Sequence, residues 1–393
     1  GPAAAGAFFL VTLVPVLGFL NVYPMRYSYV ADHFQYLATL GPITLAVGLL
    51  TAGGRRLVAG GRPGTRTLRL AGGAAAGALL AVLGLLTLAQ SRMYRNEETL
   101  WRATLVRNPR SWMAHNNLGM LLAARGETDR AIGQFQEALR ERPDHAGALS
   151  NLGGAYLRQG KLDQAKSAVL QALALDPDLP GARNSLAQVL LAEGRAAEAL
   201  RALEALVRDA PAYAPGEGSL GSALLRTGRA GEAEPHLRRA LELDPHLADA
   251  RFNLALLLGG ESRHRETIEV LREGLRMEPA NASFQQLLAW ELATTPDAAL
   301  RDGAEAVRLA RAALAKATAT GSEAPAGSAQ AASPADPVYA YTLAAALAEA
   351  GEFPAAIAAA QRAESDAARL GRTEQAATIH RAIEWLRQGR ALH

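Results

Sequence analysis

The stretch that decides the fold runs from Ala146 to Leu179 and reads AGALSNLGGAYLRQGKLDQAKSAVLQALALDPDL. Its pattern returns every 34 residues along much of the chain. The prolines at this spacing are Pro109, Pro143, Pro177, Pro211, Pro245 and Pro279. In phase with them run Leu118, Leu152, Leu186, Leu220, Leu254 and Leu288, then Gly126, Gly160, Gly194 and Gly228, and Ala131, Ala165, Ala199 and Ala233. A fixed period of this length indicates stacked structural repeats.

Each recurring residue type has a physical role in a pair of antiparallel helices. Glycine permits the tight turn that ends the first helix, and proline ends the second. Alanine lets the two helices approach, while leucine, with Phe135 or Leu237, fills the space between them. The period and these residue types are typical of the tetratricopeptide repeat (TPR), whose helix pairs bury their apolar faces only by stacking on neighbours. The sequence therefore predicts an all-α solenoid over residues 112–317.

Three further segments border this array. Residues 96–111 predict half a repeat, because Trp101 falls at the large apolar position of a second helix. Residues 318–337 are rich in Ala, Gly, Ser and Pro, and so predict a flexible linker. Residues 338–393 predict a final repeat followed by a capping helix, which covers the apolar face that the last repeat would otherwise expose.

The first 95 residues have a different, apolar composition. Three stretches, at 3–22, 36–54 and 68–90, reach or approach the roughly 20 residues that cross a bilayer as a helix. A cleaved signal peptide is the rival interpretation of the first stretch, but it would contain one short apolar core. We therefore expect three transmembrane helices ahead of the solenoid. The chain starts at Gly1 almost directly in an apolar stretch, which suggests further residues upstream.

Arginines between these stretches predict the orientation. The link between the second and third stretches carries Arg55, Arg56, Arg62, Arg66 and Arg69. Short basic loops stay in the cytoplasm. Residues 21–35 and the repeat array would then both face outward. The expected location is a bacterial-type inner membrane, with the chain an integral membrane protein and its TPR array on the extracytoplasmic side.

The predicted outward segment mixes aromatic and ionisable residues. It carries Arg26, Asp32, His33 and Tyr36. One interpretation is an interfacial belt, where tyrosine lies at headgroup depth and arginine meets lipid phosphate without specificity. The other is that Arg26 and His33 contact a phosphate-bearing lipid, with Asp32 orienting one of them. The expected partner is membrane lipid in either case, and a lipid-linked sugar phosphate in the second.

The first helix of each TPR commonly faces an extended peptide. One position on that side is Asn117, Asn151 and Asn253, interrupted by Ser185 and Ser219. Amides offer both a donor and an acceptor, so a ladder of them can pair with a peptide backbone. The alternative is that these asparagines are ordinary solvated TPR residues. The expected partner is a protein or peptide in the TPR groove.

Other classes of site find little support in the sequence. The chain contains no cysteine, which excludes disulfides and thiolate metal sites. Its eight histidines are scattered without metal-ligand spacing, so we expect no metal and no cofactor. The net charge of +3 reflects arginines beside apolar stretches, and we expect no nucleic-acid partner.

The order of apolar stretches, the segment RYSYVADHFQYL at 26–37 and a TPR array resembles the C-terminal part of transmembrane-and-TPR O-mannosyltransferase-like proteins. That family uses a polyprenyl-phosphate sugar as donor. The resemblance implies donor-phosphate contacts at Arg26, Asp32 and His33, and acceptor contacts at the ladder asparagines. The family's catalytic carboxylate has no counterpart here, so no catalytic residue is assigned and enzyme activity is left undecided. The alternative is a non-catalytic membrane-anchored TPR scaffold.

Overall fold

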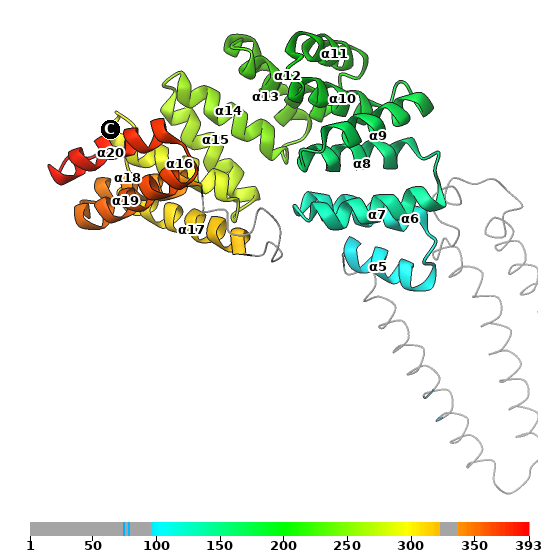
Figure 1. Cartoon of the computed structure of the whole chain (residues 1–393), viewed down its shortest axis with the longest axis horizontal. Helices are drawn as coiled ribbons and strands as arrows, with labels where there is room; N and C mark the ends of the chain where they lie inside the picture. The colour runs from blue at the N-terminus through cyan, green and yellow to red at the C-terminus, as the bar shows by residue number, and fades with distance from the viewer. Residues whose placement is uncertain (1–73, 75–77, 79–95, 323–335, 393) are drawn as a thin grey trace, which may run out of the picture. The chain divides into compact units, whose positions relative to one another are not determined.

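The computed structural model describes residues 74, 78, 96–322 and 336–392 of the chain. They are helical throughout, apart from short turns, and fall into two compact units with a boundary between Asp144 and His145. We describe each unit by itself (Figure 1).

In residues 96–144, the described part of the first unit, one helix is followed by a helix pair. Its helices are α5 (Glu97–Arg107), α6 (Trp112–Ala124) and α7 (Thr128–Glu141). Asn96 caps α5 by accepting a hydrogen bond from the Thr99 amide at 2.9 Å. Phe135 of α7 is almost fully buried and fills the space beside α6. The helix pair therefore follows the expected pattern of a large residue held between two close helices.

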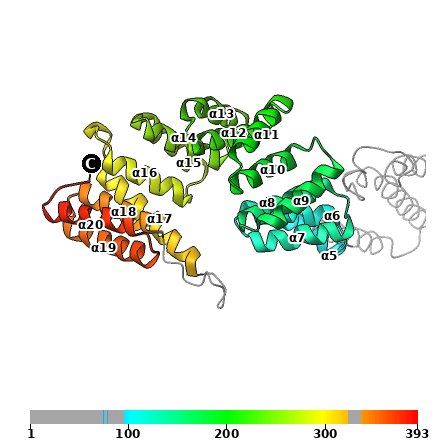
Figure 2. The ribbon, with the colours of Figure 1, turned by 45° about the horizontal axis from the view of Figure 1, so that its top comes forward.

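The second unit is a longer stack of helix pairs. Its first helices are α8 (Ala146–Arg158), α10 (Pro180–Ala192), α12 (Ala214–Arg226), α14 (Ala248–Gly260), α16 (Ala282–Thr294) and α18 (Pro337–Glu349). Its second helices are α9 (Leu162–Leu175), α11 (Ala196–Asp209), α13 (Ala230–Leu243), α15 (His264–Met277), α17 (Gly303–Ser322) and α19 (Phe353–Arg369), and α20 (Thr373–Arg387) follows them. A short 3-10 helix, η2 (Ala298–Leu300), precedes α17. Both views show successive pairs side by side (Figures 1 and 2).

The recurring residues occupy the places that their chemistry predicts. The turn glycines Gly126, Gly160, Gly194 and Gly228 have φ of 79°, 70°, 79° and 76°. Only glycine adopts this left-handed conformation at little cost. The fifth turn has Ser262 instead, and its φ is 60°. The helix-contact alanines Ala131, Ala165, Ala199 and Ala233 are fully buried. The prediction of a TPR stack is thus confirmed at these positions.

A second set of glycines sets the distance between paired helices. A Cβ atom added to Gly153 of α8 would lie 2.5 Å from Val169 Cγ2 of α9. At Gly119 the corresponding distance to Phe135 Cε1 is 2.6 Å. Such contacts are too short for any side chain, so glycine is required by close packing rather than by backbone conformation.

Polar side chains in the first turn of several first helices fasten each repeat to the preceding one. Each lies six residues after a period proline and bonds to its carbonyl oxygen. The distances are 2.9 Å for His115 and Pro109, 2.9 Å for Arg251 and Pro245, and 2.8 Å for Gln285 and Pro279. These contacts satisfy carbonyl groups that the ends of the second helices leave unpaired.

The first and second helices form two distinct rows in the second unit. The backbone of α8 lies close to that of α10, and the same holds for α10 and α12, α12 and α14, α14 and α16, and α16 and α18. In the described residues, successive second helices make at most sparse backbone contact. Long side chains bridge them instead, as in the ion pair between Arg238 and Glu266 at 3.1 Å. The first-helix row is therefore the inner side of the stack.

The last helix covers the end of the stack. Ile379, Ile383 and Leu386 of α20 are buried in the same core as the alanines of α19. The opposite face carries exposed charged residues such as Glu374, Arg381 and Glu384, beside the half-exposed Trp385. This polar outer face is what a terminal capping helix requires.

The membrane part of the predicted fold is corrected. Across residues 96–322 and 336–392, none of the helices combines the length and the apolar character that a bilayer crossing needs. The physical reason is that these helices bury one face and keep charges on the other. Even α17, the longest with 20 residues, carries Glu305, Arg308, Arg311 and Lys316. The finding overturns the three transmembrane helices of the predicted fold class and the integral-membrane, extracytoplasmic location predicted with them.

Several predictions fall on other parts of the chain. The apolar stretches at 3–22, 36–54 and 68–90 lie outside the described residues except for Ala74 and Ala78. Most of the predicted linker at 318–337 lies outside them too. The predicted domain limits therefore stay predictions.

Candidate functional site

The predicted ladder asparagines lie on first helices. Asn117 of α6 belongs to the first unit and accepts a 3.5 Å hydrogen bond from Asn116. Asn151 of α8 and Asn253 of α14 belong to the second unit, and both are half-buried. Between them, Ser219 Oγ accepts from Gln188 Nε2 at 3.2 Å. Arg26, Asp32, His33 and Tyr36, the predicted phosphate contacts, lie outside the described residues.

A group of hydroxyls gathers at the start of the inner row. Gly181, in the first turn of α10, lies between two of them. A Cβ atom built there would be 3.2 Å from Ser150 Oγ of α8 and 3.7 Å from Tyr213 Oη, which precedes α12. Burial raises the pKa of Tyr213 above the ordinary tyrosine value. Three repeats thus meet at Gly181, beside Ser150, which is 7% exposed, and the half-buried Tyr213.

The adjoining turn extends this polar surface. Gly154 of α8 faces Ser185 of α10, whose Oγ would be 3.9 Å from an added Cβ. Asn184, next to Ser185, is 7% exposed, and its Oδ1 has no hydrogen-bond partner in the described residues. A buried amide oxygen without a donor costs about 1–3 kcal/mol. We name Ser150, Gly181, Asn184, Ser185 and Tyr213 the inner polar cluster.

The sequence pointed to the neighbouring positions but missed most of this cluster. The ladder position is occupied by Ser185 in α10, where the pattern of asparagines is interrupted. Ser150 and Asn184 lie one residue before the ladder position of their repeats. The signal that could have identified them is the pair of glycines at equivalent positions of α8 and α10, Gly147 and Gly181.

A pair of charges relates more distant repeats of the inner row. Arg158, in the last turn of α8, is exposed to solvent. Surrounding atoms nevertheless lower the pKa of its guanidinium by desolvation, while the carboxylate of Asp249 in α14 acts to raise it. The two residues are three repeats apart in the sequence.

The side chains of the inner polar cluster offer hydrogen-bond donors and acceptors. Within the described residues, no group of three His, Cys, Asp or Glu side chains could hold a metal ion. The buried carboxylates are engaged: Glu217 lies 2.7 Å from His236 Nδ1, and Glu291 lies 2.9 Å from His264 Nδ1. Each of these pairs links a first helix to a second helix and so helps to hold the two helices together.

Comparison with known families agrees with the repeat geometry. Two sequence models described as tetratricopeptide repeat match the chain, one at residues 122–178 and the other at 86–146 and 219–282. The chain is a tetratricopeptide-repeat protein. The matched segments contain turn glycines with left-handed backbone and the buried contact alanines, so pattern and structure coincide.

Among curated proteins, the TPR chain is similar to protein O-mannosyl-transferase Tmtc2 of Drosophila melanogaster. The two are 40% identical over 68 residues, which is 17% of this chain and 7% of Tmtc2. The chain thus matches only a small part of that relative.

Solved TPR structures show partial similarity. A thermophilic TPR protein of Thermus thermophilus is 26% identical, with a TM-score of 0.43, over 46% of this chain and 99% of that one. YrrB, a TPR protein described as having an unusual peptide-binding site, is 21% identical, with a TM-score of 0.29, over 47% of this chain and 95% of that one.

Proposed function

We propose that this TPR protein binds an extended segment of a partner protein along its first-helix row. The observation that carries the proposal is the inner polar cluster, where the buried Asn184 Oδ1 has no hydrogen-bond partner among the described residues and two hydroxyls lie beside Gly181. An extended peptide backbone presents alternating N–H and C=O groups that complement such a surface.

The small residues of the cluster favour a backbone ligand over a bulky one. Gly154 and Gly181 add no side chain beside the hydroxyls of Ser185 and Ser150, which are 8% and 7% exposed, so a thin main-chain segment would approach them more closely than a bulky ligand. The ladder residues Asn151 and Asn253 extend the polar surface along the same row. Asn117 would make the equivalent contact on the first unit. Recognition of this kind depends on main-chain hydrogen bonds, with side-chain pockets adding specificity.

The cluster can be tested by removing hydroxyls without altering shape. A library of random 12-residue peptides would be selected on the full chain, and dissociation constants of the enriched peptides measured by fluorescence polarisation. The double variant Ser150→Ala, Tyr213→Phe should weaken binding about 5–50-fold, since each net hydrogen bond contributes about 0.5–1.5 kcal/mol. The variant Asn117→Ala, Asn151→Ala, Asn253→Ala should also weaken it.

Ser167→Ala, on the second helix α9, is the matched control. Its hydroxyl is exposed and bonds only to Gln171 of the same helix among the described residues. If no peptide is enriched, or if the enriched peptides bind the control and the cluster variants equally, the proposed binding face is wrong.

A second candidate is that the chain is part of a protein glycosyltransferase that uses a polyprenyl-phosphate sugar, with the TPR array binding the acceptor protein. The similarity to Tmtc2 favours it. In that case Arg26 and His33 would contact the donor phosphate, with Asp32 and Tyr36 beside them.

This candidate predicts binding of a soluble donor analogue. Calorimetric titration of the full chain with citronellyl phosphate should show saturable binding that Arg26→Ala and His33→Ala each abolish. Arg92→Ala is the control, because Arg92 lies outside the segment that resembles the family. If binding survives both substitutions, the glycosyltransferase candidate is wrong and only the proposal of peptide recognition remains.

A further inference from the structure

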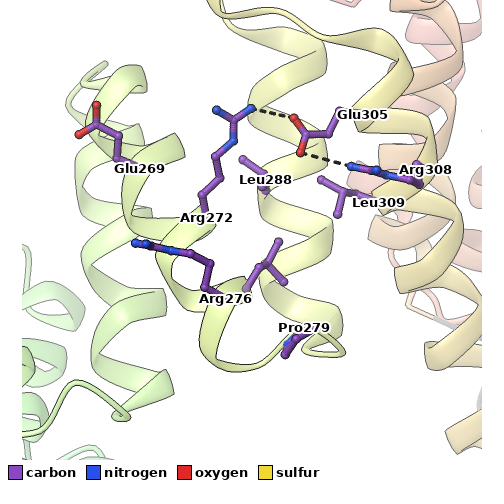
Figure 3. Close-up of a pocket in the computed structure, with 9 residues that line it drawn as sticks. Glu269, Arg272, Arg276, Pro279, Leu288, Glu305, Arg308 and Leu309 are labelled. Carbon is purple, nitrogen blue, oxygen red and sulfur yellow. Dashed lines mark hydrogen bonds and ion pairs between the residues drawn. The ribbon is translucent and has the colours of Figure 1, made fainter.

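The outer side of the second unit contains a trough that is separate from the inner polar cluster. It lies between the second helices α15 and α17, with α16 beneath them, and its volume is about 610 Å³. Leu275, Leu288 and Leu309 contribute apolar side chains to it, one from each helix. Figure 3 shows Leu288 and Leu309 between the two helices. A space of this size accommodates several side chains of a ligand.

The trough coincides with a change in the repeat period. Thr267 and Leu271 of α15 correspond to Ala306 and Ala310 of α17, a spacing of 39 residues instead of 34. The extra residues form the η2 turn. Ala310 is buried where the preceding second helices carry a large residue, so α17 packs directly on α16 with small side chains. The chain between α15 and α17 is therefore longer than the chain between earlier second helices, and Ala310 is smaller than the residues at the equivalent positions.

The charges around the trough are unbalanced. Arg272 Nη2 lies 2.7 Å from Glu305 Oε2, and Arg308 Nη2 lies 3.4 Å from the other oxygen of the same carboxylate. Figure 3 shows both arginines reaching Glu305, whereas Arg276 extends away from that pair. Arg276 is exposed and makes no ion pair within the described part of the chain. The lining thus carries three arginines against two carboxylates: Arg272 and Arg308 share Glu305, while Arg276 and the exposed Glu269 make no ion pair within the described residues.

The neighbouring gap between α13 and α15 shows the balanced case. Arg263 lies 2.8 Å from Glu234, and Arg238 lies 3.1 Å from Glu266. Each of these two arginines has a carboxylate on the opposite helix. At the trough, by contrast, the single cross-helix carboxylate Glu305 serves two arginines, and Arg276 has no carboxylate partner among the described residues.

We infer that this trough is a second docking site, for an acidic segment of a partner protein that inserts a leucine-sized side chain. The apolar residue would cover the half-buried Leu275 and Leu309 above the fully buried Leu288, and a flanking carboxylate would pair with Arg276. An apolar anchor beside a bidentate arginine–carboxylate pair is a common arrangement at protein interfaces. The site is independent of the first-helix row, since its residues come from α15, α16 and α17 and its charged rim from the two second helices.

Fluorescence polarisation with labelled peptides tests this inference on the full chain. The probe GSELESGS has one leucine between two glutamates, and GSKLKSGS and GSESESGS are its charge and side-chain controls. The acidic leucine peptide should bind, and both controls should bind at least 10-fold more weakly. Arg276→Glu should weaken the probe about 10-fold or more, because one charge contact is replaced by repulsion. Leu309→Ser should weaken it similarly.

Arg208→Glu is the matched variant, since Arg208 occupies in α11 the position that Arg276 occupies in α15. It should leave probe binding unchanged, as should Ser150→Ala with Tyr213→Phe in the inner polar cluster. Because Arg276 is exposed, its substitution should leave the fold intact even if Leu309→Ser does not. The inference is overturned if the probe fails to bind, if GSKLKSGS binds equally well, or if Arg276→Glu has no more effect than Arg208→Glu.

Discussion

Arg251 of α14 donates from Nη2 to the carbonyl oxygen of Pro245 at 2.9 Å and from Nη1 to Glu273 of α15 at 3.0 Å. It is 3% exposed, so a charged side chain is buried at a position where other repeats carry polar residues such as His115 and Gln285. One guanidinium therefore links the end of one repeat to both helices of the next.

Arg251→Met should lower the free energy of unfolding by about 2–3 kcal/mol, because the methionine keeps much of the volume but leaves the Pro245 carbonyl unpaired. Urea unfolding followed by circular dichroism measures the change. Arg265→Met, an exposed position on α15, should change stability by less than about 0.5 kcal/mol. Equal effects at both positions would show that the Pro245 contact contributes little.

Ser262→Gly should stabilise the second unit by about 0.5–1 kcal/mol. Ser262 adopts a left-handed φ of 60°, where a Cβ atom is unfavourable and glycine is not. Gly194→Ala, which introduces a Cβ at φ 79°, should have the opposite sign. Thermal unfolding of both variants checks this, and a lower melting temperature for Ser262→Gly would contradict the backbone explanation.

Two glycines of the first unit should respond oppositely to alanine. Gly119→Ala would place Cβ 2.6 Å from the buried ring of Phe135 and should cost about 1–3 kcal/mol by overpacking. Gly133→Ala, within α7, would meet no atom within 4 Å and should stabilise by about 0.5–1 kcal/mol through helix propensity. Hydrogen exchange of α6 and α7 amides in each variant reports the local change. Similar shifts in the two variants would refute the packing argument.

Arg263 should contribute to stability in a pH-dependent way. Its hydrogen bonds lower the pKa of Glu234 and Glu266 below the values that these groups have in the unfolded chain. Such groups contribute stability that is fully present above the unfolded pKa and is lost as the pH falls through the folded pKa. The difference in melting temperature between the native chain and Arg263→Met should therefore be largest near pH 7 and shrink toward pH 3. Because neither carboxylate is buried, with side chains 24% and 44% exposed for Glu234 and Glu266, 1 M salt should also reduce it. A difference that is constant with pH would rule this contribution out.

The repeat positions could be predicted because each is fixed by a local requirement. A left-handed turn requires Gly126 or its equivalents, and a close helix contact requires Ala131 or its equivalents, wherever they occur in the chain. The same reasoning predicted Asn151 and Asn253 on first helices. It could not predict that Arg158 is influenced by Asp249, since that relationship arises only when several repeats are stacked.

The sequence pattern did not predict the trough, and it predicted transmembrane helices that the structure does not support. The trough depends on the replacement of a large residue by Ala310 and on an inserted turn. A 34-residue pattern does not predict how these two changes together alter the spacing of the helices. The transmembrane prediction rested on counting apolar residues at 3–22, 36–54 and 68–90. Such a count shows only that a stretch is long enough to cross a bilayer as a helix. None of the described helices has the length and apolar character that this requires.

The unequal spacing of the two helix rows has a mechanical consequence. Since first helices touch their successors while second helices are joined by long ion-paired side chains, small bending motions pivot on the inner row and are magnified on the outer one. A wedge that spreads α15 from α17 would tilt α14 toward α16 without sliding their interface. Binding of a ligand between the second helices would therefore change the curvature of the first-helix row.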